Sequence, residues 1–296
     1  MSAVKMSRLR GQLRLDEPMS KHTSWRVGGF ADAYYIPADL ADLQAYLRTL
    51  DDEIPITWIG LGSNLLVRDG GIRGIVIAPL GGLKQLEMDA EGQIYAECGL
   101  VNSRVARFCQ KHQLAGLDYL AGIPGTIGGA LAMNAGAFGF ETWNLVTEVT
   151  LINRRGELIQ RLPEDFEIGY RHVNLPADEW FVAARFGLKE RAAADSDMKA
   201  LLEKRYQSQP IGLPSCGSVF KNPPGQYAAR LIARAGLKGY RQGTACVSDK
   251  HANFIISHAD TRAGDIEALI RLIQNTVQQM SGIALETEVR IIGEAL

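Results

Sequence analysis

Two glycine-rich segments have compositions that could support ligand chemistry. The first, residues 60–71, reads GLGSNLLVRDGG and follows a predicted strand. Glycines let a ligand approach the backbone closely and reach its N–H groups, which suits a pyrophosphate. The segment is not a Rossmann fingerprint, because Leu65 replaces the third glycine and residues 66–77 are predicted to form a strand and a turn instead of a helix. A glycine-rich hairpin without a ligand is the alternative interpretation.

The second segment, residues 122–139, reads GIPGTIGGALAMNAGAFG. It lacks the Gly-Lys-Ser/Thr ending of a Walker P-loop. Its small residues would let a short helix lie against a flat or phosphorylated ligand, and a helix N-terminus near Thr126 would favour an anion. A tightly packed structural helix is the alternative. Each glycine in a helix lowers the stability of that helix by about 1 kcal/mol relative to alanine, which argues against a purely structural helix.

Hydrophobic periodicity predicts the elements that must position these segments, and their mixed order indicates an α+β fold. The expected strands cover residues 33–36, 56–61, 74–77, 83–88, 93–97, 146–153, 158–162, 181–188, 244–247, 254–257 and 283–292. The expected helices cover residues 40–50, 103–112, 195–207, 227–235 and 262–280, the last with Thr261 as its N-cap. The polar helix 195–207 and the prolines after it are typical of a connector, so the last third is expected to form its own unit.

The composition excludes several classes of function. With 32 Lys and Arg against 33 Asp and Glu, no basic excess indicates a nucleic-acid partner. No run of about 18 uncharged apolar residues appears, and no apolar segment follows the basic residues near the N-terminus, so we expect neither a membrane partner nor export. Four separated cysteines and five histidines show no metal-ligand spacing, which favours reduced thiols in a cytoplasmic protein with no metal. We expect a monomer.

Three further motifs complete a recognisable set: HTSWRVGG at residues 22–29, GSVFKNP at 217–223 and EVRIIG at 288–293. Together with the glycine-rich segments, and in this order along nearly the whole chain, they closely resemble the UDP-N-acetylenolpyruvoylglucosamine reductase family. The resemblance implies a bipartite FAD-binding region of the vanillyl-alcohol-oxidase (PCMH) type and a C-terminal domain that closes over a UDP-sugar. The expected division is 1–80 and 81–194 for two FAD-binding subdomains and 195–296 for the substrate-binding domain.

The resemblance also implies an activity: NADPH-dependent, FAD-mediated reduction of UDP-N-acetylglucosamine enolpyruvate to UDP-N-acetylmuramate for peptidoglycan synthesis. Between Trp180 and Ser218 there is no room for the tyrosine-bearing loop of the longer family type, so the chain resembles the shorter type II form. Gln226, Arg241 and Thr244 depart from the expected pattern.

Site residues are implied position by position. Arg171, Ser218 and Glu288 resemble the catalytic residues. The implied substrate-binding residues are Tyr170, Lys221, Asn222 and Gln226. The implied cofactor-binding residues are Gly60, Gly62, Ser63, Asn64, Leu65, Gly122, Pro124, Gly125, Thr126, Gly128, Gly129, Asn134 and Gly136.

The implied chemistry explains these residue types. Hydride from flavin N5 reaches C3 of the enol ether only if charge developing on the adjoining carboxylate is stabilised, which suits the guanidinium of Arg171. Glu288 would repel that carboxylate if ionised, so we expect it to be protonated or to lie close to Arg171, with a pKa raised by burial and like charge. Ser218 would then protonate C2, helped by Lys221 or a water relay. Two rivals remain: an oxidase that uses O₂ on a similar FAD scaffold, and a non-catalytic flavin-binding module.

Overall fold

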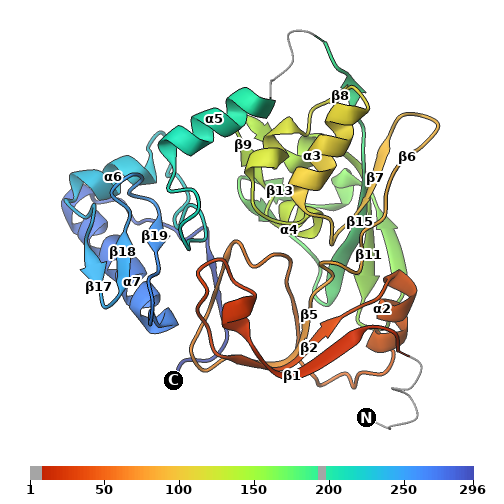
Figure 1. The fold of residues 1–296 in the computed structure, drawn as a ribbon, viewed down its shortest axis with the longest axis horizontal. Helices are drawn as coiled ribbons and strands as arrows, with labels where there is room; N and C mark the ends of the chain where they lie inside the picture. The colour runs from red at the N-terminus through yellow and green to blue at the C-terminus, as the bar shows by residue number, and fades with distance from the viewer. Residues whose placement is uncertain (1–8, 193–197) are drawn as a thin grey trace. The chain divides into compact units, whose positions relative to one another are not determined.

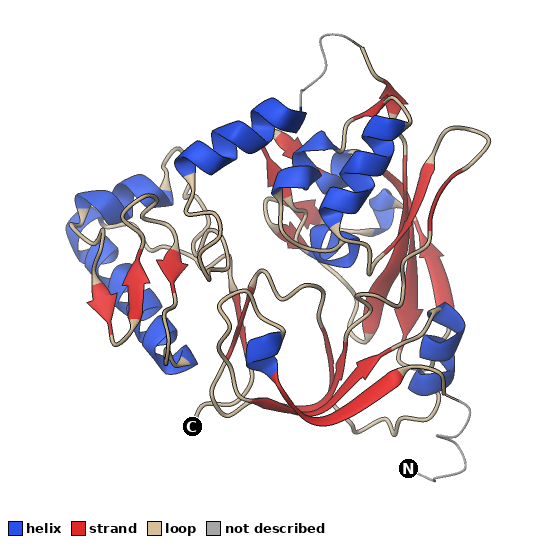
Figure 2. Ribbon diagram, viewed as in Figure 1, coloured by secondary structure: helices blue, strands red, loops and turns tan. Residues whose placement is uncertain are grey.

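The computed structural model describes residues 9–192 and 198–296, and Figure 1 and Figure 2 show its mixture of helices and strands. The chain divides into two compact units. The first takes its described residues from 1–14, 33–61 and 74–203, and the second from 15–32, 62–73 and 204–296. The second unit therefore combines the C-terminal third with two short segments from the first quarter of the chain.

The first unit is built on a five-stranded antiparallel sheet of order β12-β11-β15-β7-β6. Its strands are β6 (Leu86–Met88), β7 (Ile94–Glu97), β11 (Val146–Asn153), β12 (Leu158–Arg161) and β15 (Glu179–Phe186). Helix α4 (Ile127–Ala132) contacts β15 and β7, and helix α3 (Asn102–Lys111) packs on the segment 118–122 that precedes α4 (Figure 1). A hydrophobic core of these elements thus supports the second glycine-rich segment.

A second core of the first unit lies around helix α2 (Leu40–Leu47), where Leu43, Tyr46 and Leu47 are buried. Asp39 caps this helix by accepting the Asp42 N–H at 2.9 Å. The adjoining sheet has the order β1-β2-β5-β3. Its strands are β1 (Gln12–Pro18), β2 (Phe30–Ile36), β3 (Ile56–Trp58) and β5 (Ile72–Ile77). The division between the two units runs through β1, β2 and β5.

The second unit packs helices α6 (Ala228–Arg234) and α7 (Ala263–Ser281) with a three-stranded antiparallel sheet and a two-stranded parallel one. The antiparallel sheet contains β17 (Arg241–Gln242), β18 (Ala245–Val247) and β19 (Ile255–Ile256); the parallel pair is β4 (Leu65–Val67) with β20 (Arg290–Ile292). The apolar stripe of α7 is buried, as its helical spacing predicts.

Several sequence-based boundaries need correction. Thr261 does not cap α7: its hydroxyl accepts the N–H of His258, and the helix starts after Arg262, whose N–H bonds to Asp265. The strand expected at 283–292 forms only as β20. Strand β1 was not predicted. The connector helix is α5 (Met198–Ser208), and its expected start at residue 195 lies outside the described residues.

The remaining short elements connect the larger ones. They are the strands β8 (Leu114–Ala115), β9 (Gly136–Ala137), β10 (Phe140–Glu141), β13 (Ile168–Gly169), β14 (His172–Val173) and β16 (Lys189–Glu190), and the 3₁₀ turns η1 (Met19–Lys21), η2 (Asp118–Gly122), η3 (Thr142–Asn144) and η4 (Pro163–Asp165).

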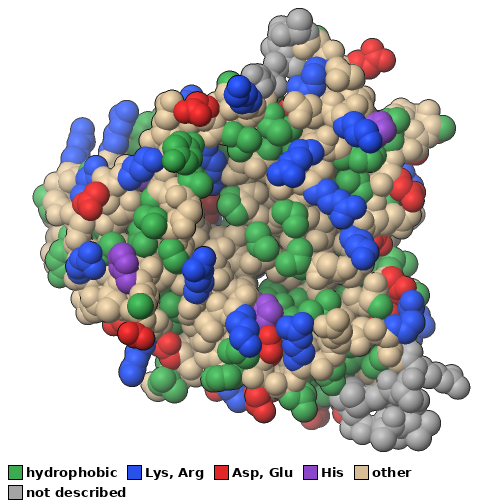
Figure 3. Space-filling model, viewed as in Figure 1, with side chains coloured by type: hydrophobic (Ala, Val, Ile, Leu, Met, Phe, Trp, Pro, Cys, Tyr) green, Lys and Arg blue, Asp and Glu red, His purple; other side chains and the backbone are tan. Residues whose placement is uncertain are grey.

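The surface agrees with a nearly neutral composition. The face shown in Figure 3 carries both basic and acidic side chains, the basic ones across its middle and edge and the acidic ones mostly toward its edge. Across residues 9–192 and 198–296, no helix has the length and hydropathy to span a membrane.

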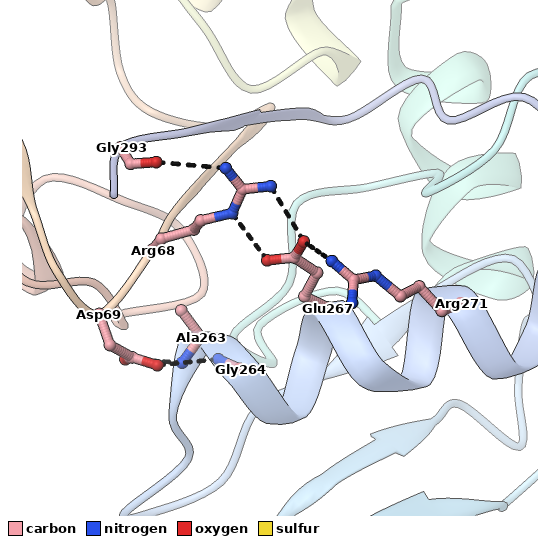
Figure 4. A network of polar contacts seen from close by, with 7 residues as sticks. All are labelled: Arg68, Asp69, Ala263, Gly264, Glu267, Arg271 and Gly293. Atoms are coloured by element: carbon pink, nitrogen blue, oxygen red, sulfur yellow. Dashed lines mark hydrogen bonds and ion pairs between the residues drawn. The ribbon is translucent and has the colours of Figure 1, made fainter. Parts of the chain in front are cut away.

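A polar network fixes residues 68–69, which directly follow β4, to the start of α7 (Figure 4). Asp69 accepts the N–H groups of Ala263 at 3.0 Å and Gly264 at 2.9 Å, so a distant segment caps this helix. Arg68 forms a two-pronged ion pair with Glu267 at 2.9 and 3.0 Å. Arg271 contacts the same carboxylate at 2.6 Å.

The same network predicts a pH-dependent stability. The hydrogen bond from Arg68, together with the charges of Arg68 and Arg271, holds the pKa of Glu267 below its ordinary value. A lowered folded-state pKa means that the carboxylate stabilises the fold above its unfolded pKa, and that this stability is lost as pH falls through the folded value. Glu267→Gln should lower the free energy of unfolding by about 1 kcal/mol at pH 7. The difference from the parent should shrink as pH falls below the pKa of an unfolded glutamate, about 4.3, and vanish once pH is below the lowered folded-state pKa.

Chemical denaturation at a series of pH values measures this difference. Asp260→Asn, a change of an exposed acid in the same unit, is the control and should leave stability nearly unchanged at every pH. A Glu267→Gln deficit that persists undiminished at pH 3 would show that the carboxylate charge is not what stabilises the network.

Candidate active site

The turn at Gly62 is required by the protein's own packing. Gly62 has a φ of 68°, and an added Cβ would collide with the carbonyl of His22. Its carbonyl accepts the N–H of Ser24 at 3.1 Å. The motif at residues 22–29 is itself anchored, because the Trp25 indole N–H donates to the carbonyl of Ile255 at 2.8 Å. The protein's own contacts thus hold this turn of the first glycine-rich segment.

Asn64, expected to lie beneath the cofactor, is bonded to the segment that carries Glu288. Its side-chain amide donates to the carbonyl of Glu288 at 3.0 Å, and its own carbonyl accepts the N–H of Arg290 at 3.0 Å. The parallel register of β4 with β20 continues this contact from Leu65 onward. The first glycine-rich segment therefore also fixes the backbone of the proposed catalytic glutamate.

The N-terminus of α4 is formed where it was expected. Thr126 is the N-cap, and its hydroxyl accepts the N–H of Gly129 at 3.4 Å. The N–H groups of Ile127 and Gly128 donate to the carbonyls of Leu100 and Cys98, both at 2.9 Å. The first-turn donors are thus used within the protein, and the expectation that they bind an anion has no support in these contacts.

The glycines around α4 have different reasons to be glycine. An added Cβ at Gly60 would lie 2.5 Å from the Thr126 hydroxyl oxygen, and one at Gly128 would lie 3.0 Å from Cβ of Cys98, so both allow close protein packing. At Gly129 the nearest such atom is 3.8 Å away and the residue is exposed. The bare backbone at Gly129 is a surface on which a flat ligand such as FAD can lie.

Asn134 and Gly136, expected to contact the cofactor, position the guanidinium of Arg171. Arg171 has a φ of 54° and donates to the carbonyl of Gly136 at 2.6 Å and to that of Asn134 at 3.3 Å. Asn134 is buried, and its amide donates to the carbonyl of Gly169 at 3.1 Å and to Glu141 at 3.0 Å. These contacts join the two turns on either side of the guanidinium and fix its direction. The aromatic ring of Tyr170 lies beside it, with 4.9 Å between ring centroid and Cζ.

Ser218 and Glu288 lie on neighbouring backbone segments of the second unit. Phe220 pairs with Thr287 in antiparallel fashion, and the N–H groups of Glu288 and Val289 both donate to the carbonyl of Val219, at 2.8 and 3.3 Å. Glu288 and Val289 thus both face Val219, which is the pattern of a β-bulge. A bulge redirects a side chain and interrupts the strict alternation of side chains along a strand. The bulge falls at Glu288, one register step from the proposed acid Ser218. Both side chains are partly exposed.

The expected substrate residues have structural partners in this unit. Lys221 forms an ion pair of 2.6 Å with Glu286, which offsets part of the positive charge expected beside Ser218. Asn222 accepts the N–H of Ala228 at 3.1 Å and so caps α6. Gln226 is exposed. Through these contacts Lys221 and Asn222 help to fix the loop that carries Ser218.

The expected site residues divide between the two units. The contacts of the second unit join Ser218, Glu288, Lys221 and Asn64. Arg171 belongs to the first unit, together with Asn134 and Gly136. That all three catalytic candidates meet at one substrate stays a prediction. Sequence reasoning missed that Asn64, Asn134 and Gly136 hold catalytic candidates in place, because the partners are remote and no periodicity reports them.

The comparisons with known proteins bear on this geometry. Residues 31–161 match the model of an FAD binding domain, and residues 209–292 match that of the C-terminal domain of UDP-N-acetylenolpyruvoylglucosamine reductase. The chain is 55% identical to the UDP-N-acetylenolpyruvoylglucosamine reductase of Alkalilimnicola ehrlichii over 96% of each chain. The chain belongs to the UDP-N-acetylenolpyruvoylglucosamine reductase family.

Other members of this family agree. The chain is 54% identical to the UDP-N-acetylenolpyruvoylglucosamine reductase of Methylococcus capsulatus, over 97% of this chain and 95% of the relative. The crystal structure of the Thermus caldophilus reductase matches with a TM-score of 0.80 and 31% identity, over 96% of this chain and 99% of that one. The expected fold class is confirmed, and the chain is an FAD-dependent oxidoreductase of this family.

The bare surface at Gly129 predicts a variant that folds but loses its cofactor. Gly129→Leu should be tolerated by the fold, since little lies near the new Cβ and leucine is a better helix former. Its bulk should weaken FAD binding roughly 10- to 100-fold, the equivalent of about 1–3 kcal/mol of steric cost. Flavin absorbance per protein and titration of the apoprotein with FAD measure the effect.

Gly264→Leu is the matched control, because Gly264 is also exposed in the first turn of a helix, α7, to which no ligand is assigned. It should keep the parent's FAD affinity. Unaltered affinity in Gly129→Leu would remove α4 from the cofactor site.

Proposed function

We propose that this protein reduces the enolpyruvyl group of UDP-N-acetylglucosamine enolpyruvate to give UDP-N-acetylmuramate in peptidoglycan synthesis, with NADPH as electron donor. The proposal is supported by membership of the family over 96% of the chain. The observation that carries it is the backbone pairing at Val219, which brings Glu288 within one register step of Ser218 along the chain. A hydroxyl and a carboxyl from these two positions would suit protonation beside a substrate carboxylate.

The residue whose surroundings fit FAD is Gly129, which is exposed and has little beside its Cβ position. When bound, FAD supplies a hydride carrier between NADPH and the substrate double bond. Residues of the chain must then bind the substrate, stabilise charge on its carboxylate and deliver one proton.

Arg171 binds the substrate carboxylate in this proposal. A guanidinium can hold a carboxylate through two parallel hydrogen bonds and keeps its charge at neutral pH. Its direction is set by the carbonyls of Asn134 and Gly136, so little rotational freedom is lost when substrate binds. Glu288, in its protonated form, adds a hydrogen bond to the same carboxylate.

Ser218 delivers the proton to C2 after hydride has reached C3. An alcohol is an adequate acid toward a carbanion-like carbon when the resulting alkoxide is stabilised. Lys221 is the nearby cation, but its ammonium group is already 2.6 Å from Glu286. Two routes complete the proton balance. Either a water molecule relays charge between Ser218 and Lys221, or Ser218 transfers its proton directly and is then reprotonated from solvent.

The proposed reaction predicts a spectroscopic cycle. Under anaerobic conditions NADPH should bleach the flavin absorbance of the purified protein, and UDP-N-acetylglucosamine enolpyruvate should restore it with formation of one equivalent of UDP-N-acetylmuramate. Reduced flavin that reoxidises only when oxygen is admitted, with no effect of the enolpyruvyl sugar, would contradict the proposal.

Removal of the proposed acid should affect one half of this cycle. Ser218→Ala should bind FAD and be bleached by NADPH at the parent rate, whereas reoxidation by the enolpyruvyl sugar should slow roughly 10²- to 10⁴-fold. Rapid-mixing absorbance separates the two halves. Ser215→Ala, a change in the same loop, is the control and should reoxidise normally; a Ser218→Ala protein that does so too would refute the assignment.

A further inference from the structure

The backbone segment that carries Ser218 has hydrogen-bond partners on both sides. On one side, the N–H of Lys221 donates to the carbonyl of Glu286 at 2.9 Å, and the carbonyl of Val219 accepts the bulge N–H groups. These contacts set the register toward Glu288. On the other side, the described residue that bonds to the backbone of Val219 and Phe220 is Asn253.

Asn253 makes three hydrogen bonds to this segment. Its carbonyl accepts the N–H of Val219 at 2.9 Å. Its side-chain oxygen accepts the N–H of Phe220 at 3.0 Å, and its side-chain nitrogen donates to the carbonyl of Phe220 at 2.8 Å. A primary amide offers donor and acceptor side by side, as a peptide group does, so Asn253 serves as the missing strand neighbour.

Asn253 lies in the loop between β18 and β19, which has hydrogen bonds of its own. The N–H of Ser248 donates to the carbonyl of Phe254 at 2.9 Å, and the N–H of Phe254 to that of His251 at 3.0 Å. The Ser248 hydroxyl accepts the N–H groups of Lys250 and His251 at 3.2 and 3.3 Å. These bonds constrain the loop around Asn253, which is only 4% exposed.

Loss of these bonds would be costly at this place. Phe220 is 1% exposed, so its N–H and carbonyl would be left buried without partners, at about 1–3 kcal/mol each. The segment would relieve this cost by shifting toward water. Ser218 lies two residues away, and a displacement of about 1 Å at a reacting group can reduce a rate roughly 10²-fold.

We propose that Asn253 is a positioning residue, which holds the Ser218 segment in register with Glu288 so that the hydroxyl meets the substrate carbon. The inference rests on the proposed function, since that function gives Ser218 its role. Asn253 acts only through the backbone of residues 219–220. Its loss should therefore impair proton delivery and leave flavin reduction intact.

Asn253→Asp tests the inference in the holoenzyme. The carboxylate has nearly the same shape but cannot donate to the carbonyl of Phe220 when ionised. Flavin reduction by NADPH should stay within about twofold of the parent, while reoxidation by UDP-N-acetylglucosamine enolpyruvate should slow roughly 10- to 100-fold. The solvent deuterium isotope effect on reoxidation should increase, because proton transfer becomes more strongly rate-limiting. A purely structural role would not change this isotope effect.

Two further variants sharpen the result. In Ser218→Ala, addition of Asn253→Asp should cause no further loss of reoxidation rate, because both changes affect one step. Ser257→Ala is the matched control: it removes a buried hydrogen bond to the Trp25 carbonyl in the same unit, and should lower the melting temperature without changing the isotope effect. Should Asn253→Asp fail to fold, Asn253→Ser carries the same test, since its shorter side chain cannot reach both Phe220 groups.

The outcomes are distinct. A parent protein whose flavin is not reoxidised by the enolpyruvyl sugar overturns the proposed function itself. A parent that is reoxidised, together with an Asn253 variant that matches it in rate and isotope effect, overturns the positioning role alone. Additive losses in the double variant overturn it as well.

Discussion

The parallel pairing of β4 with β20 is the contact on which the second unit depends. It brings residues 65–67 beside residues 290–292, and the polar contacts of Asn64, Arg68 and Asp69 extend it at both ends. A short strand pair would be weak alone. Here β4 is followed directly by Arg68, which pairs with Glu267, and by Asp69, which caps α7. These contacts fix the first glycine-rich segment, which precedes β4, together with β20, which follows Glu288.

This arrangement gives the glycine-rich segments two tasks. Gly62 makes a turn that only glycine tolerates against the His22 carbonyl, while Asn64, two residues later, holds the backbone of Glu288. In the first unit, Gly136 leaves room for the guanidinium of Arg171. A family motif interpreted as a cofactor cradle thus also holds the candidate catalytic residues Arg171 and Glu288. Gly129 differs, since the nearest atom to its Cβ position, the Thr126 hydroxyl oxygen, is 3.8 Å away and leaves ordinary contact space.

Local pattern predicted part of this structure well. The strand at Val146–Asn153 and the buried stripe of α7 follow from alternation and helical spacing, which depend on nearby residues. The cap of α7 was wrong, because the acceptors are Asp265 and, from 194 residues away, Asp69. No local signal reports such a partner. The bulge at Glu288 and the bonds of Asn253 escape prediction for the same reason, as they arise where remote segments pair.

The chain passes between its two units after residues 14, 32, 61, 73 and 203. Neither unit is therefore a contiguous module. A genetic exchange that replaced only residues 204–296 would import β20 without the β4 it evolved beside, and Arg68 would face an unfamiliar α7. Recombination at the apparent domain border is thus disfavoured, and the halves of this protein are expected to have diverged together, as one inherited unit.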